Sequence, residues 1–303
     1  MDHLENEQPV LAPTGAGNSV AVSTPSSTNA GRCTSCGGAG PTASLGSSYI
    51  YAMGVIAPRF PRPSVEKELA HVMSRTETKG LTHQQCLKKV IQAPQNRYLL
   101  RQLCWVMSVA GVETYLVTPH YQTDFDMLAE TVREAPNPMD LNVIVGIRGP
   151  VASADMCNGL TLPVVFFDML YSFERTELLE AIPRPDKMPA KQFTDAAGEL
   201  FSHIIQITHN TGATDEHRAL NYLAVRYPAI YAQIAAESAA NASLTSVSVK
   251  KSVLSGARRI VDVIFDYTNR ATDVVQKYAV RLDVTEEFPY IISKLSPYFD
   301  RLL

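Results

Sequence analysis

The sequence lacks the features that define several large classes of protein. It has no run of lysine and arginine longer than a pair such as Lys250-Lys251, and its net charge is −3 at pH 7. The basic surface that binds DNA or RNA phosphates is therefore missing, and we expect no nucleic-acid partner. No apolar stretch approaches the roughly 20 residues of a membrane-spanning helix, so we expect no membrane partner either. Residues 1–10 are acidic and lead into no apolar segment, so they do not resemble a targeting signal. We therefore predict a cytoplasmic location.

Cysteine is scarce, with five in 303 residues. Without a secretory signal, so few cysteines favour a reducing compartment and argue against a disulfide framework. Cys33 and Cys36 are separated by two residues and followed by Gly37, which is the spacing of half a zinc knuckle. A structural zinc ion is therefore the one cofactor that the sequence suggests, and a redox-reactive pair is an alternative. Because the pair lies in a glycine-rich segment, an inert linker is the favoured interpretation.

A zinc site at this pair would need two more ligands. His83 and Cys86 are three residues apart and would share one face of a helix. Cys104 and Cys157 are the alternate thiols. The three later cysteines are also explained as small buried side chains, since free cysteine is among the residues most often buried.

Recognised catalytic motifs are missing as well. The sequence contains no Gly-x-Ser-x-Gly elbow and no His-Glu-x-x-His zinc helix. Residues 146–150 follow an apolar stretch but lack the lysine and hydroxyl of a phosphate-binding loop, so we interpret them as a turn. Arg148 could bind a carboxylate there, although a surface or structural arginine is the more common case. We interpret Glu286 and Glu287 as a strand end or surface turn rather than as a catalytic pair.

Residues 215–232 bring the most chemically able groups onto one predicted helix. Thr214 can cap this helix, and the acidic Asp215 suits its first turn. Asp215, His217 and Arg218 are the candidate catalytic residues, as general acid, general base and anion-binding group. Successive side chains on a helix diverge by about 100°, so they cannot converge on one atom without partners from another element. Helix capping, ion pairing and core packing are therefore the favoured uses, and catalysis would need His217 to line a pocket shared with another element.

The distribution of apolar residues predicts one folded α+β domain preceded by a tail. Residues 1–48 are rich in Gly, Ser, Thr, Ala and Pro and cannot bury enough apolar surface to offset the entropy of ordering, so we expect them to be disordered. Residues 49–303 are expected to mix helices with antiparallel sheet in one domain. Apolar and polar residues alternate over 257–267 and 274–284, which predicts a C-terminal β-hairpin.

Three further segments receive specific predictions. The stretch that follows Pro94, through Trp105 to Ala110, is predicted as one long helix. Residues 174–238 are predicted to be mainly helical, with a break at Pro228. The proline-interrupted end, residues 288–303, is expected to pack irregularly or as a short helix.

Several separate segments carry a family resemblance. They are NRYLLRQLCW at 96–105, VGIRGP at 145–150, MCNGL at 156–160, the helix at 215–232, VTEEFPY at 284–290 and KLSPYFD at 294–300. Together and in this order they resemble the C-terminal domain of unknown function of the PatG and PatA cyanobactin maturation proteins. The resemblance covers about residues 49–303.

The resemblance implies a role in making ribosomally synthesised and post-translationally modified peptides. In that family the domain typically follows a protease domain. No subtilisin-like region precedes it here, so we expect a free-standing form without protease activity. The resemblance implies a non-catalytic accessory or scaffold protein that binds precursor peptide or peptide-maturation enzymes, and it supplies no established catalytic residue. The alternatives are an uncharacterised peptide-modifying enzyme and a zinc-stabilised oligomerisation module, for example a homodimer.

Overall fold

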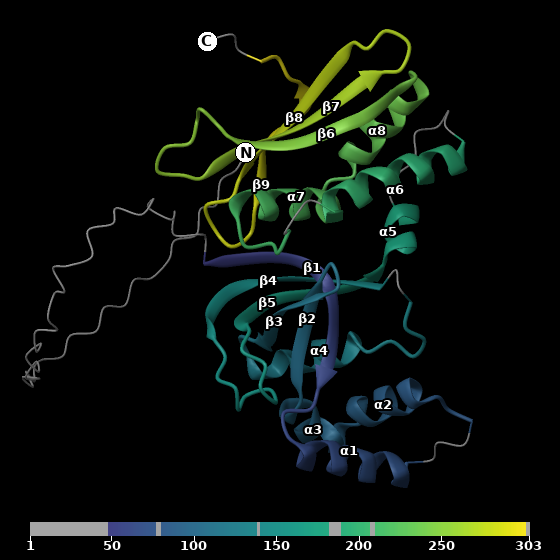
Figure 1. Cartoon of the computed structure of the whole chain (residues 1–303), viewed down its shortest axis with the longest axis vertical. Helices are drawn as coiled ribbons and strands as arrows, with labels where there is room; N and C mark the ends of the chain where they lie inside the picture. The colour runs from purple at the N-terminus through teal and green to yellow at the C-terminus, as the bar shows by residue number, and fades with distance from the viewer. Residues whose placement is uncertain (1–47, 77–79, 138–139, 182–188, 207–209, 301–303) are drawn as a thin grey trace, which may run out of the picture. The chain divides into compact units, whose positions relative to one another are not determined.

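The computed structural model describes residues 48–76, 80–137, 140–181, 189–206 and 210–300. The predicted tail, which includes Cys33 and Cys36, lies outside the described residues except for Ser48. All described elements belong to one compact unit, Ser44–Leu303. Helices and two sheets of mainly antiparallel strands make up this unit, so the predicted α+β class is confirmed (Figure 1).

A closed five-stranded barrel forms the first half of the unit, in the order β1-β2-β3-β5-β4. Its strands are β1 (Tyr49–Arg59), β2 (Cys104–Val109), β3 (Val112–Pro119), β4 (Asp140–Val151) and β5 (Pro163–Glu174). Neighbouring strands are antiparallel except β3 and β5, which pair in parallel and close the barrel. Closure leaves no free strand edge on the barrel.

Short helices pack against one side of the barrel. They are α1 (Pro63–Arg75), α2 (His83–Gln92), the 3₁₀ turn η1 (Pro94–Asn96), α3 (Arg97–Gln102), the 3₁₀ turn η2 (Gln122–Asp124) and α4 (Phe125–Glu130). Their apolar faces join the barrel side chains in one core cluster. The start of α2 is fixed by a capping box between Thr82 and Gln85, in which each side chain bonds the other residue's backbone.

Trp105 corrects the prediction of one long helix after Pro94. The helix α3 ends at Gln102, and Trp105 lies in β2, where it pairs with Pro58 and Val117. The segment from Cys104 to Val109 is rich in aromatic and β-branched side chains, which fit a buried strand. The Trp105 indole NH donates to the Leu100 carbonyl at 3.3 Å, so this buried polar group has a hydrogen-bond partner.

A four-stranded antiparallel sheet forms the second half, in the order β6-β7-β8-β9. Its strands are β6 (Ala242–Lys251), β7 (Ile260–Asn269), β8 (Val275–Asp283) and β9 (Tyr290–Pro297). The β7–β8 pair is the predicted hairpin. The strand β9 corrects the expectation of irregular structure or a short helix after residue 288. It pairs with β8 through two register shifts, and such irregular pairing weakens the alternating pattern by which a strand is recognised.

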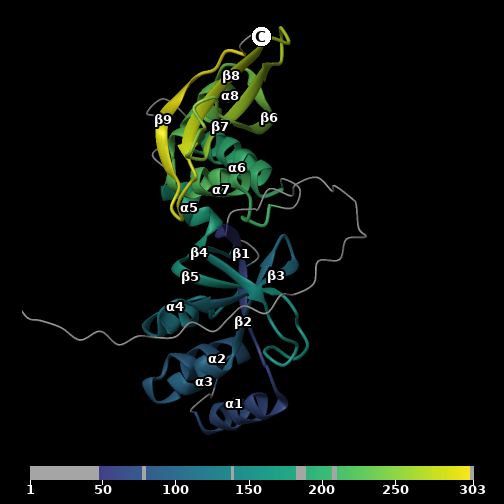
Figure 2. The same ribbon diagram turned by 90° about the vertical axis from the view of Figure 1, so that its left-hand side faces the viewer.

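In the described ranges, four helices precede this sheet: α5 (Arg175–Ala181), α6 (Ala190–Gln206), α7 (Asp215–Arg226) and α8 (Ala229–Ala239). They confirm the prediction of a mainly helical region over residues 174–238. Pro228 separates α7 from α8. Side chains of α6, α7 and α8 share one apolar core with β7 and β8 and with Tyr51 and Val145 of the barrel. Both views place α7 between β1 and β7 (Figures 1 and 2). None of the described helices is long and apolar enough to cross a membrane.

Asn221 of α7 ties the helix to the barrel. Its side chain is fully buried and donates to the Tyr51 carbonyl of β1 at 2.8 Å. It also exchanges hydrogen bonds with the Asn210 side chain. Because buried amides are costly unless paired, these bonds fix the register of α7 against β1. The side chains that precede Asn221 on α7 are positioned by this anchor.

Candidate functional site

Arg218 of α7 has no exposed surface. Its guanidinium donates to the backbone carbonyls of Val284 at 2.7 Å and Glu287 at 3.0 Å, and also to that of Glu286. Burial is the main reason that the pKa of Arg218 falls to about 10, and Asp215 partly offsets it. The side chain therefore stays charged near neutral pH and holds the loop between β8 and β9 by its backbone.

Asp215 lies between two arginines. Its Oδ1 is 3.1 Å from Arg259 Nη1 and 3.5 Å from Arg218 Nη1. Burial is the largest influence on this carboxyl and raises its pKa, against the lowering effect of both arginines. Arg259 also donates to the Thr285 carbonyl at 2.6 Å. Asp215 and Arg218 thus belong to one ion-pair network that fixes the β8–β9 loop.

His217 lies next to these groups on α7. It is half-buried, and its backbone NH donates to the Thr214 hydroxyl at 3.1 Å, which confirms Thr214 as the helix cap. Glu286 contacts α7 through its backbone carbonyl, which accepts a hydrogen bond from Arg218. Asp215 and Arg218 therefore make ion pairs and hydrogen bonds that hold the fold together, and the backbone of His217 takes part in the helix cap. A catalytic role for the three residues stays a prediction.

Arg148 lies exposed on β4. The predicted turn at residues 146–150 is wrong, because these residues belong to that strand. Gly146 explains the glycine in the motif, since a Cβ there would lie 2.1 Å from the Phe166 carbonyl oxygen. The register between β4 and β5 shifts at this glycine, so a bulge and a close strand approach, not a turn, need the missing side chain.

A cluster of titratable groups that the sequence did not single out lies beside the Arg218 network. His120 follows β3, Asp168 lies on β5, and Glu287 lies in the β8–β9 loop. His120 Nδ1 is 3.1 Å from Asp168 Oδ1, and Asp168 acts on the pKa of the Glu287 carboxyl. Three segments far apart in the sequence thus meet at one point.

Glu287 is the unusual member of this cluster. Burial, followed by the charge and hydrogen bond of Asp168, raises the pKa of Glu287 to about 7, although Arg218 and His120 act in the opposite direction. Two carboxyl groups in contact share a proton because both cannot be charged without strong repulsion. A group that gains and loses a proton near neutral pH, next to a histidine, can serve in general acid–base chemistry. Asp168 had a signal in the sequence, as one acidic residue inside the apolar run Val164–Tyr171.

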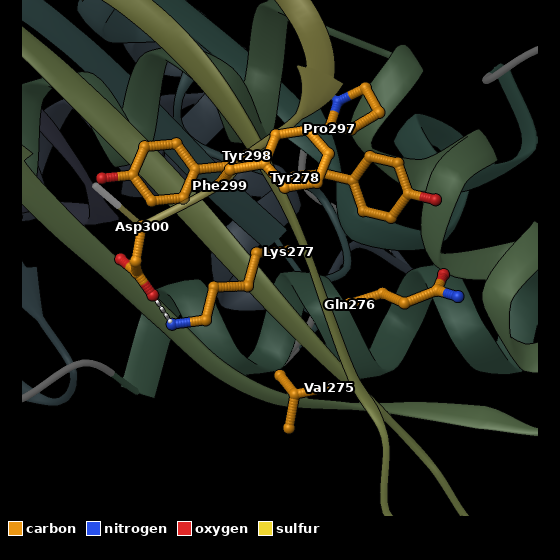
Figure 3. A pocket seen from close by; sticks show the side chains of 8 residues that line it. All are labelled: Val275, Gln276, Lys277, Tyr278, Pro297, Tyr298, Phe299 and Asp300. Carbon is orange, nitrogen blue, oxygen red and sulfur yellow. Dashed lines mark hydrogen bonds and ion pairs between the residues drawn. The ribbon is translucent and has the colours of Figure 1, made fainter. Parts of the chain in front are cut away.

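A cleft of about 540 Å³ lies where the start of β8 meets the segment after β9 (Figure 3). Lys277 and Asp300 face each other in this cleft, with Lys277 Nζ 2.7 Å from Asp300 Oδ2. Lys250 Nζ of β6 is 3.6 Å from the other oxygen of Asp300. Phe299 is 82% exposed. The lining residues are Val275, Gln276, Lys277, Tyr278, Pro297, Tyr298, Phe299 and Asp300.

Cys104 and Cys157 form a disulfide, with their Cα atoms 5.9 Å apart. The expectation that the cysteines form no disulfide is therefore wrong for this pair, and neither residue is available as an alternate zinc ligand. The bond joins β2 to the loop between β4 and β5. The two residues are 53 positions apart, and a count of cysteines cannot show that barrel closure brings such positions together.

The predicted partnership of His83 and Cys86 is also not supported by their surroundings. His83 is exposed at the start of α2, whereas Cys86 is buried and its thiol is 4.0 Å from the Met73 carbonyl. Within the described ranges, no group of three or more His, Cys, Asp or Glu residues is placed to hold a metal ion. Cys33 and Cys36 lie outside the described residues, so zinc binding by that pair stays a prediction.

Comparison with known proteins concerns both halves of the unit. Residues 187–298, which contain α6 to β9, match the family model described as PatG C-terminal. This stretch is therefore similar to the PatG C-terminal family. A solved structure described as "PatG Domain of Unknown Function" matches 83% of this chain and 99% of its own, with a TM-score of 0.68 and 16% identity. At this identity the likeness shows the fold. No curated protein matches the chain.

The stretch that matches the PatG C-terminal model contributes the network of Asp215 and Arg218, the Glu287 carboxyl and the cleft lining as far as Tyr298, whereas Phe299 and Asp300 lie beyond the match. The barrel contributes His120 and Asp168, which lie before residue 187. The acid–base cluster therefore joins the matched stretch to the barrel, whereas the cleft is lined by the end of the matched stretch and the two residues after it.

Proposed function

We propose that this protein is a non-catalytic accessory protein in the biosynthesis of ribosomally synthesised, post-translationally modified peptides of the cyanobactin kind. It binds the precursor peptide or a peptide-maturation enzyme. The observation that carries the proposal is the cleft at residues 275–278 and 297–300, which combines aromatic and apolar side chains with paired charges. The PatG C-terminal match, which includes residues 275–278 and 297–298 of this cleft, supports the peptide context.

The composition of the cleft suits an extended peptide better than a small compact substrate. Tyr278, Tyr298 and Phe299 offer apolar surface, and a backbone strand forms one wall. Aromatic residues supply contact area at a low entropic cost, and paired charges at the rim add orientation. The large exposure of Phe299 gives a partner an apolar side chain to cover.

The surroundings of α7 support a non-catalytic role. Arg218 and Asp215 are engaged with backbone carbonyls and with Arg259, so their polar groups already serve the fold. A substrate would have to displace these contacts to reach them. The helix with the most reactive groups in the sequence is thus a poor place for chemistry.

Calorimetric titration of the full chain with the precursor peptide and the modifying enzymes encoded beside it tests the proposal. We expect saturable binding to at least one of them, weakened by Phe299→Ala. Phe288→Ala is the matched control, because Phe288 is an exposed phenylalanine outside the cleft lining. Absence of binding to every one of these molecules would refute the proposal. Equal weakening by both variants would move the contact away from the cleft.

The cluster of His120, Asp168 and Glu287 favours a second candidate, a peptide-modifying enzyme that works by proton transfer. In a reconstituted pathway, His120→Gln and Glu287→Gln would then reduce the peptide product without unfolding the protein. His217→Ala tests whether the peptide-modifying enzyme instead uses the residues of α7, namely Asp215, His217 and Arg218. Unchanged product in all three variants would exclude both versions.

A zinc-stabilised oligomer, for example a homodimer, is the third candidate, based on Cys33 and Cys36 in the sequence. Elemental analysis and light scattering of wild type and of Cys33→Ser and Cys36→Ser variants test it. Bound zinc together with a metal-dependent change of mass would support it, and a metal-free protein of unchanged mass would exclude it.

A further inference from the structure

The segment after β9 lies on the chain's own cleft. Pro297 is the last residue of β9 and lacks the NH that would extend the strand ladder. The Tyr298 NH then donates to the Lys277 carbonyl at 2.8 Å. Two residues later, the Asp300 carboxylate reaches two lysines on different strands. The segment Tyr298–Asp300 therefore makes one backbone bond and one bridging carboxylate contact, as a short bound peptide would.

The lysines that meet Asp300 come from β6 and β8. Asp300 is 2.7 Å from Lys277 Nζ and 3.6 Å from Lys250 Nζ. Lys277 also has Asp266 of β7 at 4.0 Å. The contact with Asp300 raises the pKa of Lys277 and lowers that of Asp300, which keeps both groups charged. Together the two lysines offer one carboxylate a pair of cationic donors.

We propose that Lys250 and Lys277 form a carboxylate-binding site that the chain's own Asp300 fills, and that an acidic peptide with neighbouring aromatic residues displaces the Asp300 carboxylate from the two lysines while Phe299 stays available to contact the peptide. The inference rests on the proposed peptide-binding function and names its ligand chemistry. The segment itself shows this chemistry, since its sequence is Tyr-Phe-Asp.

The internal contact is weak enough to be exchanged. The Asp300 side chain is 50% exposed, and those of Lys277 and Lys250 are 29% and 56% exposed, so solvent reaches both ion pairs and screens them in part. Phe299 points almost wholly into solvent and so holds the segment little. A peptide that makes the same carboxylate contact and also buries an aromatic side chain would bind the two lysines more tightly than the internal Asp300 does.

Fluorescence anisotropy with a labelled probe tests the proposal on the full chain. The probe is a synthetic peptide with the sequence Ser-Pro-Tyr-Phe-Asp-Arg of residues 296–301, blocked at both ends. We expect Asp300→Asn to bind this probe roughly two- to fivefold more tightly than wild type, because the internal competitor has lost its charge. Adding Lys277→Ala or Lys250→Ala to that variant removes the gain.

Two controls separate the site from general electrostatics. Lys251→Ala removes the neighbouring exposed lysine of β6 and leaves the affinity of the Asp300→Asn variant unchanged. A probe with asparagine in place of aspartate binds wild type and Asp300→Asn equally. Equal affinity of the acidic probe for wild type and Asp300→Asn overturns the proposal, as does a gain that survives Lys277→Ala.

The proposed function can fail separately. If the precursor peptide or a maturation enzyme binds wild type, Asp300→Asn and Lys277→Ala with one affinity, the carboxylate site is wrong and the accessory role stands. If none of them binds but the probe shows the expected gain, the site stands and the accessory role is wrong.

Discussion

The Arg218 guanidinium lies 2.7 Å from the backbone carbonyl oxygen of Val284, with no part of the arginine exposed to solvent. A fully buried charged side chain thus binds main-chain atoms of the β8–β9 loop. A buried cation requires such a set of partners, because desolvation alone would expel it. The relationship makes the charge structural.

Replacing Arg218 should therefore unfold the protein before it affects any chemistry. Arg218→Met leaves three carbonyl groups without their donor, and we expect a loss of about 3–5 kcal/mol in the free energy of unfolding. Arg218→Lys should fail similarly, since one ammonium group cannot reproduce the planar fork. Urea denaturation measures the loss. Arg270→Met, at an exposed arginine, is the control and should change stability by less than about 0.5 kcal/mol. An unchanged urea midpoint in Arg218→Met would contradict this account.

Glu287 should make stability depend on pH. Its folded pKa of about 7 exceeds its ordinary value of 4.5, so the folded protein binds more protons than the unfolded chain between these values. The free energy of unfolding then falls as pH rises from 4.5 to 7 and loses no more above that window through this group. Glu287→Gln should flatten this part of the pH profile.

Glu286→Gln is the matched control for that profile, since Glu286 is the exposed neighbour. Thermal unfolding of the three proteins between pH 4.5 and 8 provides the measurement. A profile that stays equally steep in Glu287→Gln would show that the proton is held elsewhere.

The Cys104–Cys157 disulfide should stabilise the barrel. It links positions 53 residues apart, and a bond across such a loop typically contributes about 2–4 kcal/mol. We expect dithiothreitol to lower the melting temperature of wild type but not that of the Cys104→Ser/Cys157→Ser double variant. Equal shifts in both would point to another cause.

The same bond tests the predicted cytoplasmic location, because stable disulfides are rare in reducing compartments. Rapid alkylation of cells that express the protein would label Cys104 and Cys157 if they are reduced there. Labelling of both cysteines would support the predicted cytoplasmic location. Protection of both would argue for an oxidising compartment.

Two glycines with a left-handed backbone, Gly212 and Gly159, allow the cost of backbone strain to be measured separately from the cost of a steric clash with the new Cβ. Gly212 has φ +77 and a Cβ there would lie 2.2 Å from the Tyr51 carbonyl oxygen, whereas Gly159 has φ +90 and nothing within 4 Å. Gly159→Ala should cost about 1–2 kcal/mol through the backbone alone. Gly212→Ala should cost clearly more, because β1 must also move. Chemical denaturation compares them, and equal losses would show that β1 yields freely.

Regular elements could be predicted from the sequence where one local pattern decided the structure. Thr82 and Gln85 formed the expected capping box, Thr214 capped α7, and the hairpin at β7 and β8 followed its alternation. Trp105 was predicted as helical and lies in a strand, because its pairing with Val117 and Pro58 is a tertiary contact. Local propensity could not reveal it.

The candidate site was predictable only as a set of residues. The sequence singled out Asp215, His217 and Arg218, but the partners of Arg218 are carbonyl groups 66 to 69 positions away. Main-chain acceptors carry no residue type, so no motif could indicate them. His120 and Asp168 are likewise joined across 48 positions by the parallel pairing of β3 and β5, which short-range patterns do not show.

The anchor between Asn221 and the Tyr51 carbonyl bears on where this protein can be divided. The family match begins at residue 187, yet α7 within it buries an amide and apolar side chains against β1, which ends at residue 59. A fragment cut at the match boundary would present that surface, with an unsatisfied amide, to water. The unit of sequence similarity is thus smaller than the unit of folding, and excision at residue 187 should give an aggregating chain where the intact protein stays monodisperse.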